Sequence, residues 1–174
     1  MRLLTPRQLN EKIFHDTWAA SVSPGEIFFQ EAFESPTAIE NHYILSLMGD
    51  FTSKRILDLG CGLGDAAIYF AQKGAVAEAV DISPKMIELV KHFAEKRGVS
   101  KNVKAMFMTA ENLQFADESF DFVYGNGILH HVEFIKVAGE IKRVLKKNGK
   151  AFFVEPLSYN PIIGVYRKIA NRVR

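Results

Sequence analysis

The sequence predicts a doubly wound α/β fold, in which a mostly parallel β-sheet lies between helices on both faces. Three observations support this prediction. Short apolar runs typical of strands alternate with helical patterns between residues 55 and 154. A glycine-rich run at residues 56–65 joins the first of these strands to a helix. The chain has 174 residues, 48% hydrophobic and 24% charged, which is the size and composition of one globular domain.

A helix is expected near the start of the chain. Thr5, Pro6 and Gln8 have the spacing of an N-cap, a first-turn proline and a capping-box partner. The helix should run from there through Trp18, and the Ser23-Pro24-Gly25 segment should end it.

A second helix should open at Ser35-Pro36 and end at Gly49. Its apolar residues recur at helical spacing, which predicts one inward face. The residues expected on that face are Tyr43, Ile44, Leu47 and Met48.

Strands and helices then alternate. The expected strands are Arg55–Leu59, Val76–Val80, Val103–Met108, Phe120–Tyr124 and Ala151–Val154. The expected helices are Asp65–Lys73, one capped by Ser83-Pro84 and ending at Gly98, and Phe134–Lys147. Ligands of such sheets lie beyond the carboxyl ends of the strands, which is where the glycine run falls.

The glycine run, from Ile56 to Asp65, reads I-L-D-L-G-C-G-L-G-D. One acid, Asp58, interrupts the apolar strand, and three glycines follow at alternate positions. Because these glycines lack a Cβ atom, the backbone can approach a ligand closely. The alternative is a structural turn that binds no ligand.

A dinucleotide site is the obvious competitor, but its loop needs the pattern G-x-G-x-x-G. Counting from Gly60, the last glycine of that pattern would stand at Asp65. The carboxylates of Asp58 and Asp65 would also repel a pyrophosphate, whereas they would attract a cationic ligand.

The run resembles the cofactor loop of class I S-adenosylmethionine-dependent methyltransferases, which reads D-x-G-C-G-x-G. Their cofactor carries an ammonium and a sulfonium and no phosphate. The resemblance covers about residues 40–155, is of the methyltransferase type 11 kind, and implies a Rossmann-like sheet of order 3-2-1-4-5 with an N-terminal helical lid. It implies a lid segment at residues 1–50, a cofactor-binding core at residues 51–156 and a helical tail at residues 157–174.

The same resemblance implies contacts beyond the loop. Asp81 ends the second strand, where a carboxylate can accept both ribose hydroxyls; the alternative is an acid that only precedes a helix. Ile82 would pack on the adenine, and Ala110 would meet it through its backbone N–H. Thr109 stands where the family has an acid. The implied cofactor-binding residues are Asp58, Gly60, Cys61, Gly62, Gly64, Asp81, Ile82, Ala110, Glu111 and Asn126.

His130 and His131 follow the fourth strand and are the candidate general bases. Imidazole titrates near neutral pH, and several branches of the family have a histidine near the methyl group at this place. The alternative is that one ring packs and the other faces solvent. Adjacent helical positions diverge by about 100°, so no shared metal site is expected; no Cys/His cluster has zinc spacing.

The acceptor is expected to be a small molecule methylated on oxygen, nitrogen or carbon. Gly125-Asn126-Gly127-Ile128 lacks the proline motif of enzymes that methylate the exocyclic amines of bases, and the acids of metal-dependent catechol methylation are absent. Phe14, His15, Asp16 and Trp18 resemble the F-H-D-x-W-A opening of some small-molecule methyltransferases. They would form the lid and part of the acceptor pocket, unless Phe14 and Trp18 are only an apolar helix face.

Composition limits the setting and the partners. A net charge of +2 gives no general affinity for nucleic acid. No apolar run approaches the ~20 residues of a membrane span, and the first residues do not form a signal peptide. The single cysteine, Cys61, excludes a disulfide framework and fits a reducing compartment such as the cytoplasm.

The chain departs from the family at its end. Only 19 residues follow Glu155, too few for the helix and two strands that complete the family's sheet. The sequence is therefore expected to be a piece or a natural short form, with the fifth strand at an exposed edge. The tail from Tyr159 to Arg174 is apolar on one side, as for a core helix cut short, an oligomer contact or a surface membrane anchor. It, or a second chain, would cover the edge.

Three functions follow. The first is methyl transfer from S-adenosylmethionine to a small molecule. The second is a module that binds S-adenosylmethionine or its demethylated product without turnover, because the acceptor wall would be missing. The third and most distant is a nicotinamide-dependent oxidoreductase.

Overall fold

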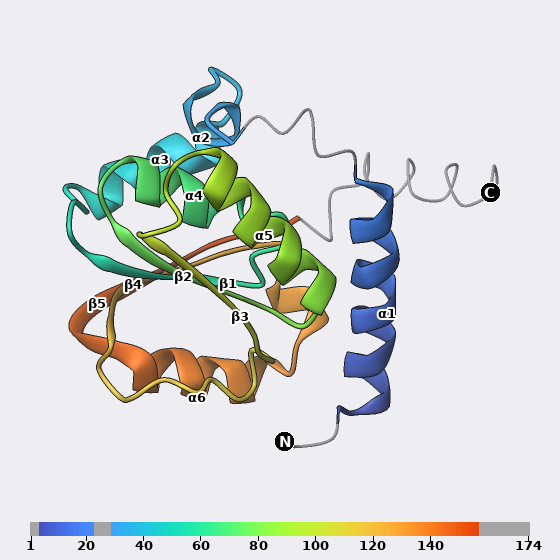
Figure 1. Cartoon of the computed structure of the whole chain (residues 1–174). Coiled ribbons are helices and arrows are strands. Elements are labelled where there is room, and N and C mark those ends of the chain that lie inside the picture. The colour runs from blue at the N-terminus through green and yellow to red at the C-terminus, as the bar shows by residue number, and fades with distance from the viewer. Residues whose placement is uncertain (1–3, 23–28, 157–174) are drawn as a thin grey trace.

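The computed structural model describes residues 4–22 and 29–156. Its centre is a parallel sheet in the order β3-β2-β1-β4-β5, so the expected strand order is confirmed (Figure 1). The strands are β1 (Arg55–Leu59), β2 (Val76–Asp81), β3 (Val103–Phe107), β4 (Phe120–Asn126) and β5 (Leu145–Val154). The helices are α1 (Pro6–Ser21), α2 (Glu31–Glu34), α3 (Ile39–Met48), α4 (Asp65–Gln72), α5 (Pro84–Lys96), a 3₁₀ turn (Leu129–His131) and α6 (Phe134–Val144).

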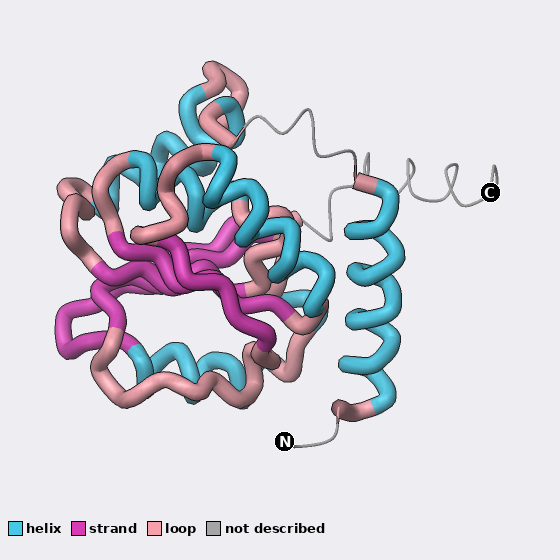
Figure 2. The backbone as a smooth tube through the Cα atoms, viewed as in Figure 1, coloured by secondary structure: helices cyan, strands magenta, loops and turns pink. Residues whose placement is uncertain are grey.

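Helices cover both faces of the sheet, with α3, α4 and α5 on one side and α6 on the other (Figure 2). Strand side chains alternate between the faces, so neighbours in β1 enter different cores. Ile56 packs with Phe70 of α4 on one face, and Leu57 packs with Val137 of α6 on the other. These fully buried side chains fix the glycine loop at the carboxyl end of β1.

Helix α1 lies beside α5 rather than on the sheet (Figure 1). The expected capping box between Thr5 and Gln8 is confirmed. The helix extends past Trp18 to Ser21, whereas the expected break at residues 23–25 lies outside the described residues. Only Ala19 of α1 is buried, so the helix is attached largely through polar contacts.

The expected start and orientation of the second long helix were wrong. Ser35 is instead the C-cap of the short helix α2, and α3 begins at Ile39. Ile44 and Met48 are buried as expected, but the side chains of Tyr43 and Leu47 are 65% and 43% exposed. A helix of this length buries one stripe, and α3 presents the Ile44 stripe to the sheet.

The boundary between α6 and β5 also differs from the expectation. The helix ends at Val144, and residues 145–147, expected as helix, already belong to β5. Leu145 pairs with Phe120, and a register shift follows before Lys150 pairs with Phe122. Asp121 has a structural role beside this junction, because its Oδ2 accepts hydrogen bonds from the Arg55 N–H (2.9 Å) and Lys146 Nζ (2.8 Å). The pairing of β5 with β4 therefore ends α6 earlier than the amphipathic pattern of residues 134–147 predicts.

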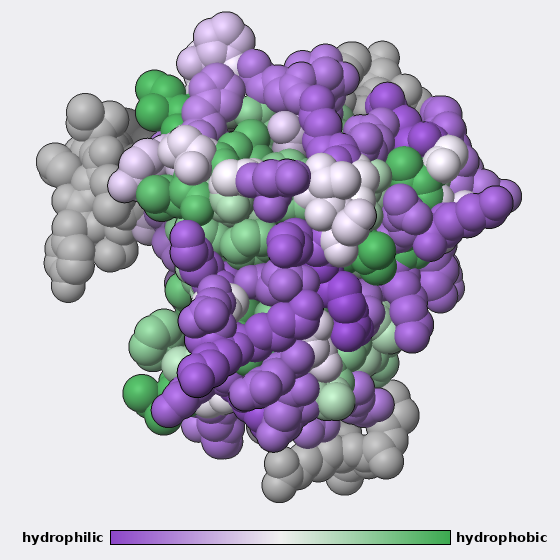
Figure 3. Space-filling view, turned by 90° about the vertical axis from the view of Figure 1, so that its left-hand side faces the viewer, coloured by the Kyte–Doolittle hydropathy of each residue, from purple (hydrophilic) through white to green (hydrophobic). Residues whose placement is uncertain are grey.

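Among the described residues β5 pairs only with β4, so its other edge is free, as expected. The expected helical tail lies outside the described residues. Several large apolar side chains are exposed on the helices, and hydrophobic groups gather in patches on the mainly hydrophilic face in Figure 3. In residues 4–22 and 29–156 no helix has the length and apolarity needed to cross a membrane.

Candidate functional site

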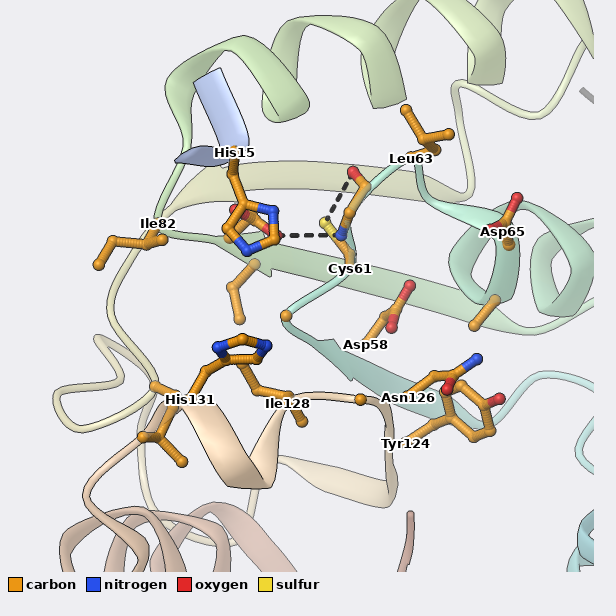
Figure 4. Close-up of a pocket in the computed structure, with 18 of the residues that line it drawn as sticks. His15, Asp58, Cys61, Leu63, Asp65, Ile82, Tyr124, Asn126, Ile128 and His131 are labelled. Atoms are coloured by element: carbon orange, nitrogen blue, oxygen red, sulfur yellow. Dashed lines mark hydrogen bonds between the residues drawn. The ribbon is translucent and has the colours of Figure 1, made fainter. Parts of the chain in front are cut away.

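A cavity of about 330 Å³ lies at the carboxyl ends of β1, β2 and β4. The glycine loop forms its floor, and α1 covers it with Gln8, Glu11, His15 and Trp18. Figure 4 shows the side chains converging from the loop, from α1 and from the segment after β4. The position agrees with the general rule for ligands of open α/β sheets.

The glycines of the loop have different roles. Gly62 has a φ of 51°, and a Cβ atom added there would meet no atom within 4 Å, so its backbone lies open to a ligand. Gly64 has a φ of 84° and is the N-cap of α4; it does not line the cavity. A Cβ there would lie 2.9 Å from the Val90 side chain. The structure thus does not bring Gly64 to the cavity with the other predicted contacts; Gly64 lies where α4 packs on α5.

Asp58 is 3% exposed, and its carboxylate lies at the cavity wall. Burial raises the pKa of Asp58 to about 7; the nearby acids Asp65 and Asp81 raise it further, and a hydrogen bond from the Ala67 N–H (3.0 Å) opposes the shift. A cation in the cavity would reverse this effect, because it favours the ionised carboxylate.

Asp81 ends β2, and both of its oxygens already accept main-chain hydrogen bonds. Oδ2 accepts from the Gly62 N–H at 3.0 Å and Oδ1 from the Ser83 N–H at 2.8 Å. Each oxygen keeps a further lone pair for a ligand hydroxyl. Burial raises the pKa of Asp81, and these hydrogen bonds partly counteract it. The residue thus fixes the loop and faces the cavity at once.

Asp65 and Cys61 complete the polar floor. Burial raises the pKa of the Asp65 carboxyl, and burial with the neighbouring aspartates raises that of the Cys61 thiol. No lysine or arginine lines the cavity among the residues that the structure describes. The floor therefore carries three buried carboxyl groups with no lysine or arginine beside them, an environment that favours a cationic ligand.

Ile82, Ala110, Glu111 and Asn126 all line the cavity, together with Gly60 and Cys61 of the loop. Thr109 does not line it; its backbone instead bridges to Asn112. Apart from Gly64, the structure thus brings the implied cofactor-binding residues to one cavity.

Glu111 has structural partners in addition to its place in the lining. Its Oε1 accepts from Arg7 Nη2 at 2.9 Å and from the Glu133 N–H at 3.1 Å, and its Oε2 accepts from Gln8 Nε2 at 2.9 Å. Glu111 therefore fastens the start of α1 to the loop after β3.

The two adjacent histidines are directed differently. His131 lines the cavity, whereas His130 is exposed and does not. Nδ1 of His130 lies 2.7 Å from Oε2 of Glu155. Of the two predicted bases, the structure thus brings His131 and not His130 to the cavity. Their rings nevertheless lie closer than the expected divergence suggests, with 4.0 Å between the centroids.

Only some of the expected lid residues lie at the cavity. His15 and Trp18 line the cavity, but Phe14 is 63% exposed and does not. Asp16 accepts hydrogen bonds from Lys12 and from the hydroxyl of Ser83. It therefore ties α1 to the N-cap of α5.

Sequence reasoning missed several lining residues. Among the additional ones are Gln8, Glu11, Ala32, Phe33, Asn41, Tyr124 and Ile128. The Tyr124 hydroxyl donates to Asn41 Oδ1 at 2.9 Å, which joins β4 to α3 in one wall. The only sequence signal for Glu11 was its position one helical turn before His15, which shows that they share a face but not what that face meets.

The site fits a nucleoside ligand that carries positive charge. Asp81 offers carboxylate oxygens for ribose hydroxyls, and Gly62 offers open backbone. Ile82 and Ala110 supply an apolar edge for a base. The buried acids oppose a pyrophosphate and favour an ammonium or a sulfonium. No feature of the lining contradicts S-adenosylmethionine, the cofactor implied by the sequence resemblance.

Comparison with known proteins agrees with this geometry. Residues 57–153 match the protein family described as "Methyltransferase domain". The chain is 34% identical over 122 residues to YcgJ, an uncharacterized methyltransferase of Bacillus subtilis, which covers 69% of this chain and 48% of YcgJ. It is 30% identical over 164 residues to the sterol 24-C-methyltransferase erg6 of Schizosaccharomyces pombe, covering 90% of this chain and 43% of that protein.

The fold is similar to that of the same bacterial relative. The crystal structure of YcgJ from Bacillus subtilis superposes with a TM-score of 0.64 and 30% sequence identity, covering 75% of this chain and 56% of that one. The chain thus spans about half the length of the relatives that it matches.

Proposed function

Because the chain belongs to the methyltransferase domain family of class I S-adenosylmethionine-dependent enzymes, we propose that it transfers the methyl group of S-adenosylmethionine to a small-molecule acceptor. The observation that carries the proposal is the acidic floor of the cavity. Asp58, Asp65 and Asp81 are largely buried around the glycine loop, and no lysine or arginine lines the cavity in the described residues. A ligand with a sulfonium and an ammonium supplies the missing positive charge.

Each part of the cofactor has a matching group. Asp81 accepts the ribose hydroxyls, while Ile82 and the Ala110 backbone bound the adenine. Gly60, Cys61 and Gly62 approach the methionine part with their backbone, and Asp58 balances its charge. The backbone around Asn126 contacts the methionine part as well, and Glu111 lines the same cavity. These roles are proposals that rest on the positions of the residues in the lining.

The bound cofactor supplies an activated methyl group, so the protein mainly aligns the reactants and excludes water. Helix α1 closes the cavity on the acceptor side with His15 and Trp18. His131 stands at the same side and can take a proton from an oxygen or nitrogen acceptor.

Calorimetric titration of the chain with S-adenosylmethionine, its demethylated product and NAD tests cofactor choice. We expect micromolar binding of the first two and none of NAD. Asp81→Asn should weaken binding about tenfold or more, because hydrogen bonds to a charged acceptor contribute about 1.5–3 kcal/mol. Glu40→Gln, which removes an exposed acid on α3, is the matched control and should bind as the natural chain does.

The outcomes separate the rival functions. Binding of NAD alone by a folded chain would overturn the proposal in favour of an oxidoreductase. Binding of S-adenosylmethionine with no transfer of its labelled methyl group to any of a panel of alcohols, amines and carbon nucleophiles would favour the module that binds without turnover. Release of the demethylated product in step with one acceptor would support methyl transfer and name the acceptor.

The cellular compartment and the oligomeric state are also part of the proposal. A single buried cysteine supports a reducing compartment such as the cytoplasm. The edge of β5 that no strand pairs with in residues 4–22 and 29–156 supports self-association as a homo-oligomer. Sedimentation of the chain at several concentrations tests the latter, and a monomer at all of them would overturn it.

A further inference from the structure

The carboxylate of Glu11 reaches from α1 to the segment after β4. Its Oε2 lies 3.1 Å from Nδ1 of His131 and 3.9 Å from Nε2 of His15. All three side chains line the cavity, and Figure 4 shows the imidazole of His15 above that of His131. Their ring centroids are 6.1 Å apart. One carboxylate on the first helix therefore joins the two imidazoles of the site.

The contact has a chemical consequence for His131. A carboxylate oxygen 3.1 Å from Nδ1 attracts a proton on that nitrogen, and so favours the neutral tautomer that carries its proton on Nδ1. Nε2 is then left with its lone pair free to accept a proton. The side chains of Glu11 and His131 are 26% and 34% exposed, so protein partly shields the pair from water. This arrangement matches a general base oriented by a third group.

His131 is also held from its other side. The ring of His130 lies against it, with 4.0 Å between centroids. Glu155, just after β5, binds Nδ1 of His130 at 2.7 Å and accepts the Leu129 N–H at 2.7 Å. The turn that carries His131 is thus anchored to the end of β5. Among the described residues, the ring of His131 also meets Glu11 and the ring of His15, both on α1.

Glu11 is not required merely to attach α1. Arg7 and Gln8 already bind Glu111, and Asp16 binds the Ser83 hydroxyl. These contacts lie on either side of Glu11 along the helix. A contact that only fastened the helix would be redundant at Glu11, whereas a contact that orients the base must be at the cavity.

We propose that Glu11 is a positioning residue that holds His131 as the proton acceptor of the methyl-transfer reaction, so that α1 completes the catalytic site as well as covering it. The inference rests on the proposed function. The X–H proton of an alcohol or amine acceptor passes to Nε2 of His131. The lone pair of X forms the bond to the methyl carbon, and the C–S bond breaks with its electron pair on sulfur. The products are the methylated acceptor, a neutral thioether and an imidazolium paired with Glu11, which releases its proton to water.

The decisive experiment reads the tautomer of His131 and needs no acceptor. Imidazole ¹⁵N shifts are measured at neutral pH in the chain labelled on histidine, with His131→Asn to assign the signal. We expect Nδ1 of His131 to be protonated in the natural chain and this preference to be lost in Glu11→Ala. Gln8→Ala, which weakens the attachment of α1 through Glu111 instead, is the control and should leave the His131 signal unchanged.

Each result has a defined meaning. A natural chain with the proton on Nε2, or an identical His131 signal in the Glu11→Ala variant, would overturn the inference. Equal changes in the Gln8→Ala and Glu11→Ala variants would assign Glu11 to attachment alone, which also overturns it. Glu11→Gln should keep the proton on Nδ1 of His131, because the amide oxygen of glutamine can still accept from that nitrogen. This result would support a positioning role for the contact between the two residues.

Titration of the natural chain with S-adenosylmethionine separates this inference from the proposed function. Binding of the cofactor together with an unaffected tautomer would overturn the role of Glu11 alone. The tautomer effect without any cofactor binding would overturn the proposed function and, with it, the reaction step. On an acceptor that turns over, Glu11→Ala should lower kcat at least tenfold while the KM for S-adenosylmethionine changes less than threefold, because the pair acts on the acceptor proton.

Discussion

Replacing Asp58 with asparagine should make the stability of the protein less dependent on pH and should weaken cofactor binding. Asp58 is 3% exposed, and burial raises its pKa from 3.8 to about 7. Because the pKa is higher in the folded state than in the unfolded chain, folding favours the protonated form. The stabilising contribution is therefore complete at low pH and is lost as the pH rises from about 4 to about 7.

The expected size follows from the shift. A difference of about three pKa units corresponds to about 4 kcal/mol of unfolding free energy lost from Asp58 between low pH and pH 8, of which about 2–3 kcal/mol is lost between pH 5 and pH 8. The asparagine cannot ionise. Its amide oxygen can still accept from the Ala67 N–H, while its NH₂ group costs about 1–3 kcal/mol at every pH if it stays unpaired.

Urea denaturation at pH 5, 6, 7 and 8 measures this effect. The unfolding free energy of Asp58→Asn relative to the natural chain should rise by about 2–3 kcal/mol across this range. Glu40→Gln, on the exposed surface of α3, is the control and should show no such trend. A constant difference between Asp58→Asn and the natural chain at all four pH values would refute the argument that Asp58 is buried without a counter-charge. In calorimetry at pH 8, the variant should bind S-adenosylmethionine at least tenfold more weakly, since a neutral amide cannot balance the ligand's charge.

Three further predictions follow from single contacts. Gly62 and Gly49 both have a left-handed φ and open space at Cβ, so alanine at either should lower the unfolding free energy by about 1 kcal/mol in denaturation. Only Gly62→Ala should weaken the binding of S-adenosylmethionine in calorimetry. Equal affinities of the two variants for this cofactor would show that no ligand approaches Gly62. Gly64→Ala should lower the unfolding free energy by more than Gly62→Ala, because the added Cβ would lie 2.9 Å from the Val90 side chain. Introducing Val90→Ala together with Gly64→Ala should recover part of this loss. A double variant whose loss equals the sum of the two single losses would contradict the clash. Partial burial opposes ionisation of Asp121, but hydrogen bonds from a lysine and a main-chain N–H hold its pKa below the ordinary value, so the stability it contributes is present above about pH 4 and is lost at lower pH. Asp121→Ala should lower the unfolding free energy by about 1–3 kcal/mol at pH 7 in denaturation and leave the affinity for the cofactor unchanged. A loss of that affinity would contradict the position of Asp121 away from the cavity.

Much of the core was predictable because its signals are local. The bounds of β1 and the start of α4 follow from an apolar run that ends in glycines, and the capping residues Thr5 and Ser83 mark the starts of α1 and α5. The parallel sheet follows from alternation, since parallel neighbours need a crossover of at least a dozen residues. Asp58 and Asp81 could be identified because strand ends at the switch point of such a sheet meet in space.

Where a helix pattern and a strand pairing compete, the sequence was misleading. Residues 145–147 continue the amphipathic pattern of α6, but the pairing of Leu145 with Phe120 takes them into β5. Tyr43 and Leu47 have the hydrophobicity of core residues and lie on the exposed side of α3. In both cases the outcome depends on a partner that is distant in the sequence, and no local pattern contains that partner.

The sequence by itself determined the order of elements, the acidic glycine loop and hence the class of ligand, because residue type and short-range spacing decide backbone conformation and local charge. Only the tertiary structure decided that His131 faces the cavity while His130 binds Glu155, that Gly64 packs on Val90, and that Glu11 reaches His131. These facts depend on how α1 and the loops dock on the sheet. Docking is set by the sum of many weak contacts, such as that between Arg7 and Glu111, 104 residues apart, and such sums are not contained in any single segment.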